Sequence, residues 1–325
     1  MTPTLLRWRG RTQAFMERVD GLTLTMVRIP AGAFVMGSPE QEPDRDPDEG
    51  PQHRVTLEEF LMAQTPITQE QWRVVAQWQP TGNEPWEKLL DPEPAWFSPA
   101  AMPAKRGHQD TQARLDADTS QRPVECVGWD AAMEYCRRLS QRTGRRYTLP
   151  SEAQWEYACR GGTTTAYGFG NEINTTLANF RPAVREDAGE AALDRQQTSA
   201  VAQFPANAWG LHDLHGNVWE WCLDEWHETY AEAPRDGRAW LSTLHGGNRV
   251  VRGGAWSDPP TDSRSACRSW LPAASGNEAN VGFRVVCLPQ ALPLDPSSPL
   301  MIPEHEEDFA PRQPIFDNSA GLEMA

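Results

Sequence analysis

The stretch GLHDLHGNVWEW, residues 210–221, decides the fold. Gly216 and Asn217 permit tight backbone geometry, and Trp219 and Trp221 supply large aromatic side chains that anchor a chain by burial. After residue 162 no pattern is helical over any length, and short strands alternate with Gly, Asn and Asp turns. The stretch is therefore typical of a turn-rich scaffold held together by buried tryptophans.

The composition of the whole chain agrees with this interpretation. Its 325 residues suffice for one large or two ordinary domains, and 28 Pro, 24 Gly and 14 Trp against 5 Tyr exclude a helical bundle. A net charge of −15 repels phosphate backbones and anionic lipid, so we expect no nucleic-acid partner. No apolar run approaches the roughly 18 residues of a membrane span, and the charged start lacks the apolar stretch of a signal peptide. We therefore expect a soluble, cytoplasmic protein.

Shifts in composition divide the chain into three parts. Residues 1–21 are polar and charged, and we interpret them as an N-terminal leader before a domain over 22–287. Within that domain, residues 80–121 lose all periodicity and predict an inserted surface loop. The tail 288–325 has seven prolines, seven acidic residues and one arginine, which predicts disorder or a path along the surface. A docking segment is the alternative, because the tail carries four spaced apolar residues: Ile302, Phe309, Ile315 and Phe316.

Hydrophobic periodicity predicts short elements elsewhere. Apolar and polar residues alternate over 22–29, and a Pro-Ala-Gly turn and a strand over 33–36 complete a predicted hairpin. Further strands are predicted over 55–62, 249–256 and 281–287. Capping boxes predict a helix of about ten residues after Thr68 and a short helix over 151–160, and 3–4-residue spacing with Gly144 as the stop predicts a helix over 129–143. The fold class is α+β, with two to three short helices and small antiparallel sheets.

Several motifs in order carry a family resemblance: IPAGAFVMG (29–37), PVECVGWDAA (123–132), LPSEAQWEYACRGG (149–162), GLHDLHGNVWEW (210–221), and RGGAW (252–256) with VGFR (281–284). Together they resemble the formylglycine-generating enzyme, or sulfatase-modifying factor, family over about residues 22–287. The resemblance implies a variant of the C-type-lectin fold with little regular structure.

The same motifs raise the question of bound metal. Asp213 and Glu220 flank carbonyls that a tight turn could direct at one point, the hard-oxygen environment that Ca²⁺ prefers. The resemblance implies structural calcium at the positions of Asp213, Gly216, Val218 and Glu220, and a second site at Asn179, Phe180 and near Asp194. His212 and His215 lie three apart but lack a third ligand at zinc-finger spacing, so an ordinary polar loop is expected there.

The cysteines decide whether the family's oxidase chemistry is expected. Members that convert a sulfatase cysteine to formylglycine hold Cu(I) with two thiolates, and the resemblance places Asp258 and Ser263 at those positions. A carboxylate and a hydroxyl are weak ligands for this soft ion, so copper binding is not expected and no catalytic residue is assigned. The six cysteines form no CxxC pair and are interpreted as reduced thiols, with one or two disulfides as the alternative.

A binding role therefore remains. Segment 255–280 lies between the RGG and VGFR motifs, and in a lectin-like fold such a segment forms an exposed surface that faces a ligand. Its candidate binding residues are Trp256, Ser257, Asp258, Thr261, Asp262, Ser263, Cys267, Ser269, Trp270, Leu271 and Asn277.

Three functional hypotheses follow. The first is a catalytically inactive relative that binds an unidentified protein or small-molecule ligand. The second is a variable protein whose segment 255–280 is diversified by a retroelement, since many residues there can arise from randomised Asn codons. The third is a copper-dependent oxidase.

Overall fold

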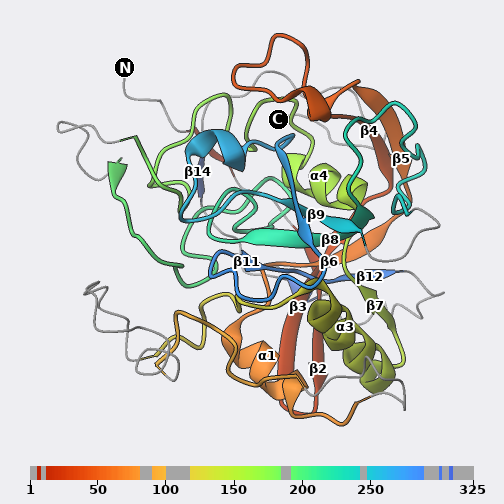
Figure 1. The fold of residues 1–325 in the computed structure, drawn as a ribbon, viewed down its shortest axis with the longest axis vertical. Helices are drawn as coiled ribbons and strands as arrows, with labels where there is room; N and C mark the ends of the chain where they lie inside the picture. The colour runs from red at the N-terminus through yellow and green to blue at the C-terminus, as the bar shows by residue number, and fades with distance from the viewer. Residues whose placement is uncertain are drawn as a thin grey trace.

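Two antiparallel-rich sheets and three helices organise the computed structural model, which describes residues 6–8, 12–80, 90–99, 118–183, 192–241, 247–288, 300–301 and 307–309. The larger sheet has the strand order β13-β2-β3-β6-β12-β7. Its strands are β2 (Gln13–Val19), β3 (Leu22–Ile29), β6 (Phe60–Ala63), β7 (Arg146–Thr148), β12 (Val286–Leu288) and β13 (Leu300–Met301). Figure 1 shows helices α1 (Gln69–Ala76) and α3 (Trp129–Thr143) beside this sheet. Between them Trp72 stacks on Tyr135 at 5.8 Å and meets Phe283 edge-on.

The smaller sheet has four strands in the order β10-β9-β8-β11. They are β8 (Trp219–Glu225), β9 (Asn248–Arg252), β10 (Arg268–Pro272) and β11 (Val281–Gly282), so β10 lies at an edge. Helix α4 (Glu152–Arg160) contacts β8, β9 and β4 (Gly32–Met36), and β4 pairs with β5 (His53–Leu57). Two 3₁₀ turns, Pro47–Glu49 and Pro260–Ser263, lie in loops. The α+β fold class is confirmed.

The three predicted helices are confirmed together with their caps. The Thr68 hydroxyl accepts from Gln71 N–H, and the Ser151 hydroxyl accepts from Gln154 N–H, so both capping boxes form. Gly144 and Gly161 end their helices in the left-handed region, with φ of 68° and 52°. These signals are local, which is why the sequence identifies them.

The predicted hairpin between residues 22–29 and 33–36 is wrong. β3 pairs with β2 on one side and β6 on the other, whereas β4 pairs with β5. Alternation identifies a strand but not its partner, and both edges of β3 are taken by other strands. Residues 13–19 therefore belong to the main sheet rather than to a leader.

Three other predicted boundaries also change. The strand predicted over 55–62 is two strands in different sheets, because the chain turns at Glu58 and Glu59, whose charges do not fit in a core. β9 ends at Arg252 because Gly253 and Gly254 adopt φ of 100° and 69°. The strand predicted over 281–287 is interrupted between β11 and β12.

Part of the predicted insertion 80–121 belongs to the core. Phe97 is 2% exposed and Ala95 is 1% exposed. Residues 81–89 and 100–117 lie outside the described residues.

In the tail, β13 pairs with β2, and β14 (Glu307–Phe309) pairs with β1 (Leu6–Trp8). Ile302, Ile315 and Phe316 of the predicted docking segment fall outside the described residues. Within the described chain, no helix combines the length and apolar character needed to span a membrane.

Candidate functional site

Buried arginines fix segment 255–280 to the rest of the fold. Arg252, the last residue of β9, donates from Nη2 to Glu156 Oε2 at 2.5 Å. The same guanidinium donates to the backbone oxygens of residues 265, 266 and 267 at 2.6–2.9 Å. Because Glu156 lies on α4, one side chain ties the segment to that helix.

Two further arginines of the segment point inward. Arg264 Nη2 lies 2.5 Å from Glu49 Oε1, and Arg268 Nε lies 2.7 Å from Glu152 Oε1. All four side chains are buried, so each charge depends on its partner. The acid-rich loop 38–53 thus supplies a counter-charge for the segment. Sequence reasoning missed these residues because the paired positions are 215 and 116 residues apart.

The predicted binding residues differ widely in exposure. Ser263 and Cys267 are buried and are not available to a ligand in this structure, which corrects their assignment. The arginines hold the 3₁₀ turn Pro260–Ser263 and strand β10 against the core, so only the outward-facing side chains of these two elements meet solvent. Trp270 and Asn277 are exposed, and the remaining members of the set are partly buried: Trp256, Ser257, Asp258, Thr261, Asp262, Ser269 and Leu271.

The two tryptophans predicted as binding anchors, Trp256 and Trp270, differ in their surroundings. Trp256 packs edge-on against Phe97 at 5.3 Å, and its Nε1 donates to the Ala279 carbonyl at 3.0 Å, so it serves the scaffold. Trp270 is 43% exposed, more than any other tryptophan whose side-chain exposure the structure describes. Its ring centroid lies 6.5 Å from that of Trp226, which Arg268 covers with its guanidinium at 4.5 Å. An exposed tryptophan on an edge strand, here Trp270 on β10, is suited to contact with a partner.

The positions matched to copper ligands hold no thiol. Trp219 Nε1 donates to Asp258 Oδ2 at 2.8 Å, and burial raises the pKa of this carboxyl. Ser263 is fully buried, next to Gly254. All six cysteines, each within the described residues, are reduced, and burial raises the pKa of the Cys267 thiol well above its usual range. A two-thiolate site for Cu(I) is not present at these positions.

The first calcium set expected from the resemblance does not fit a cation here. Both carboxylate oxygens of Glu220 accept from Arg284, at 2.6 and 2.7 Å, and Oε2 also accepts from Trp155 Nε1 at 2.8 Å. A guanidinium therefore already neutralises this carboxylate. Asp213 does keep one buried oxygen, Oδ1, that accepts no hydrogen bond.

Of the second calcium set, Asn179 keeps an unpaired side-chain oxygen, and Gln197, outside that set, supplies another. Asn179 is buried, its amide donates to the Gln197 carbonyl at 2.9 Å, and its Oδ1 accepts no hydrogen bond. Gln197 Oε1 is likewise buried and accepts no hydrogen bond. Asp194 is exposed and caps the N–H of Gln196 instead. Neutral oxygens without donors are the ligand type that Ca²⁺ takes up.

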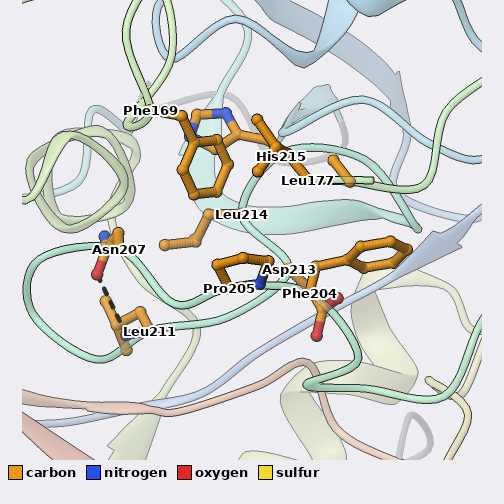
Figure 2. Close-up of a pocket in the computed structure, with 10 residues that line it drawn as sticks. Phe169, Leu177, Phe204, Pro205, Asn207, Leu211, Asp213, Leu214 and His215 are labelled. Atoms are coloured by element: carbon orange, nitrogen blue, oxygen red, sulfur yellow. Dashed lines mark hydrogen bonds between the residues drawn. The ribbon is translucent and has the colours of Figure 1, made fainter. Parts of the chain in front are cut away.

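A cavity of about 10 Å³, room for about one water, separates Asp213 from His215. Figure 2 shows the His215 imidazole beside the Phe169 ring and Asp213 on the side of Phe204. His215 Nδ1–H donates to the Ser263 carbonyl at 2.8 Å, and Nε2 accepts from Gly168 N–H at 3.0 Å. Both nitrogens are satisfied by a neutral ring. His212 bonds the Phe204 carbonyl, and within the described residues no group of three His, Cys, Asp or Glu side chains could hold a metal ion.

This buried imidazole predicts a pH dependence of stability. Burial lowers the pKa of His215 to about 4, whereas an unfolded histidine titrates near 6.5. The stabilisation it gives is complete above about pH 6.5 and is lost as the pH falls toward 4. A His215→Asn variant is expected to be less stable at pH 7.5, and the gap to the wild type should narrow below pH 6.5 by at most about 1.4 kcal/mol per pH unit.

Urea unfolding of both proteins at several pH values between 4.5 and 7.5 measures that gap. Three buried carboxyls also change the stability with pH, but in the opposite direction: burial raises the pKa of Asp213 and Asp48 to about 6 and that of Asp224 to about 7. Both proteins contain these groups, so their contributions cancel in the difference between the two free energies of unfolding. A gap that stays constant across this range would contradict the prediction.

Comparison with known proteins places these features in a family. Residues 12–288 match the Sulfatase-modifying factor enzyme 1-like domain. The chain belongs to this sulfatase-modifying factor family. The match starts at residue 12, in agreement with β2 as part of the domain.

Relatives within the sulfatase-modifying factor family differ in activity. The Formylglycine-generating enzyme of Mycobacterium tuberculosis is 30% identical over 81% of this chain and 98% of its own length. The Inactive C-alpha-formylglycine-generating enzyme 2 of Bos taurus is 28% identical over 83% of this chain and 90% of its own length. The Serine/threonine-protein kinase pkn1 of Chlamydia caviae is 31% identical over 80% of this chain, which spans only 37% of that kinase. The family thus includes proteins named as active and as inactive enzymes.

Solved structures show the same fold. PvdO from Pseudomonas aeruginosa is similar with a TM-score of 0.64 and 29% identity, over 86% of this chain and 98% of that one. Treponema denticola variable protein 1 has a TM-score of 0.62 at 21% identity, over 85% and 99% of the two chains. The fold of the sulfatase-modifying factor family is therefore shown for this chain.

Proposed function

We propose that the protein is a binding member of the sulfatase-modifying factor family without copper-dependent oxidase activity. The observation that carries this proposal is the pair Asp258 and Ser263 at the positions matched to the two copper thiolates. Asp258 is held by Trp219 and Ser263 is buried, so neither presents a soft ligand. The binding surface is the exposed part of segment 255–280 around Trp270 and Asn277, and its partner is a protein or small-molecule ligand.

Copper loading tests the loss of the oxidase. Protein purified without chelator and offered Cu(I) is expected to retain no stoichiometric copper by mass spectrometry. The same protein should consume no oxygen above background with a cysteine-containing sulfatase peptide. The Asp258→Cys/Ser263→Cys double variant is expected to gain copper, because it supplies two soft ligands. Stoichiometric copper in the wild type would overturn the proposal.

A photo-crosslinking amino acid tests the binding surface. Placed at position 270 in cells, it is expected to give discrete crosslinked products, because Trp270 lies in the proposed face. Val35, which is 48% exposed on β4, is the matched control position. Products of the same mass and yield from both positions, or none from position 270, would count against this face.

The geometry does not favour diversification of the whole segment. Ser263 and Cys267 are buried, and substitution there would change the core instead of the surface. Variation compatible with the fold is confined to positions that meet solvent, such as Asn277. Sequencing the neighbouring DNA for a reverse transcriptase gene and a near-repeat of the 252–286 coding sequence decides this alternative.

For calcium we propose one ion, at Asn179 with the Gln197 side chain, rather than two. When bound, the ion would coordinate amide oxygens that are otherwise buried without a partner, and so stabilise the fold. Calcium should therefore be found in protein purified without chelator, and an Asn179→Ala variant should lose it. Retention of calcium by that variant together with its loss in Asp213→Ala would move the site to the first set.

A further inference from the structure

A cavity of about 230 Å³ lies beside the first turn of α3. Its walls come from Trp72 on α1, from residues 90–94, and from the loop 273–276. Pockets that hold drug-sized ligands measure about 300–1,000 Å³, so this cavity matches a smaller molecule. It shares residues 273–276 with segment 255–280 but does not include Trp270.

The charge lining this cavity has one sign. Among the described residues that line it, the carboxylates are Asp91, Asp130 and Glu134, and none is a lysine, arginine or histidine. Asp91 and Asp130 are exposed, whereas Glu134 is 1% exposed. The chain's net charge of −15 adds a field that attracts cations.

The buried carboxylate keeps unused capacity. Glu134 Oε1 accepts from Arg138 Nε at 2.8 Å. Its Oε2 accepts no hydrogen bond, and Arg137 Nη1, a partly exposed group, lies 3.3 Å away. Arg138 Nη1 donates to the carbonyls of residues 76 and 78, at 3.1 and 2.8 Å. Glu134 Oε2 thus forms an ion pair with a partly exposed guanidinium but accepts no hydrogen bond, so it has a lone pair for a donor that enters the cavity.

The remaining wall is apolar and rigid. Trp72 is buried and is held by its Nε1 bond to the Asp91 carbonyl at 2.8 Å, and Val127 is held by a bond from Trp221 Nε1 to its carbonyl at 2.8 Å. A Cβ on Gly128 would lie 3.0 Å from the Ser275 oxygen, so any larger residue there would push the loop 273–276 back by a few tenths of an ångström. An indole wall also suits the flank of a cation.

One residue of the wall adopts an uncommon backbone conformation. Cys126 has φ of 60°, and its N–H donates to the Glu278 carbonyl at 3.2 Å. Non-glycine residues in this region cost about 1–3 kcal/mol and gather at functional sites. Cys126 is partly exposed, whereas the other five cysteines are buried. Its thiol therefore reports on occupation of the cavity.

We propose that this cavity binds a small molecule that joins a protonated amine to an apolar body. The ammonium lies toward Asp130 and Oε2 of Glu134, and the apolar body lies against Trp72 and Val127. The inference does not rest on a partner at Trp270.

The test is the rate at which iodoacetamide alkylates Cys126 in the native full chain, followed by peptide mass spectrometry. The probe is 2-phenylethylamine, and 2-phenylethanol and phenylacetate are the neutral and anionic controls. The amine is expected to slow alkylation about tenfold when present at ten times its dissociation constant, because protection follows 1 + [L]/Kd. The alcohol should protect less and phenylacetate least.

Variants separate a site from a general charge effect. Asp130→Asn is expected to weaken protection by the amine about two- to fivefold, as for an exposed ion pair, and Ala131→Leu should reduce it by filling the cavity. Asp236→Asn, an exposed acid outside the cavity, and Trp270→Ala should leave it unchanged. Equal protection by amine and phenylacetate, no protection, or equal losses in Asp130→Asn and Asp236→Asn would overturn the proposal.

Discussion

Replacement of Arg284 by methionine is expected to lower the free energy of unfolding by about 3–5 kcal/mol, the cost of leaving a buried charge without its partner. Arg284 donates to both oxygens of Glu220, at 2.6 and 2.7 Å, and to the His212 carbonyl at 2.8 Å. Methionine fills similar space but supplies no donor. Glu220 and the carbonyl would then be buried with too few hydrogen bonds. Urea denaturation at pH 7.5 measures the loss.

Arg28→Met is the matched control. Arg28 also forms an ion pair, with Glu59 at 2.5 Å, but the two side chains are 41% and 38% exposed. Water replaces the lost partner there, so the expected loss is about 0–1 kcal/mol. Similar losses in the two variants would show that burial does not govern the Glu220 pair. Adding Glu220→Gln to Arg284→Met should recover part of the loss, because it removes the unpaired charge.

Gly216→Ala is expected to cost about 2–5 kcal/mol, from strain in the left-handed region and from a steric clash. Gly216 has φ of 90°, and a Cβ there would lie 2.3 Å from the backbone oxygen of Asn179. That oxygen cannot easily move, because it accepts from Asn217 N–H at 2.7 Å. The variant should also disturb the bridge between residues 179 and 216. Chemical denaturation measures the change in stability.

Gly162→Ala isolates the clash from the strain. Gly162 has nearly the same φ, 92°, but a Cβ there meets no atom within 4 Å. Strain alone predicts a loss of about 1–3 kcal/mol for this variant. If both alanine variants lose the same stability, the close approach of Asn179 contributes nothing.

The elements that could be predicted from the sequence are those whose signals are local. Thr68 and Ser151 lie within three residues of the groups that they cap, so their helices follow directly. The pairing partner of β3 could not be predicted in this way, because β6 begins 31 residues after β3 ends and β4 lies nearer in the sequence. Strand alternation carries no information about that choice.

The candidate site shows the same division. The sequence does not distinguish Trp256 from Trp270 as an exposed anchor. In the structure Phe97, from the segment interpreted as an insertion, packs against Trp256. Arg264 belongs to a segment that was expected to face a ligand, yet Glu49 draws its side chain inward. The Asp258 and Ser263 substitutions could be seen in the sequence because they depend on the identity of single residues.

Arg264 and Arg268 attach segment 255–280 to the core from its inner side. The residues that hold the segment point into the protein, whereas the side chains of Trp270 and Asn277 meet solvent. Under the proposed binding role, single substitutions at these exposed positions are therefore expected to change recognition at almost no cost to folding. A protein built in this way can acquire a new specificity in one evolutionary step, while its interior sequence stays constant.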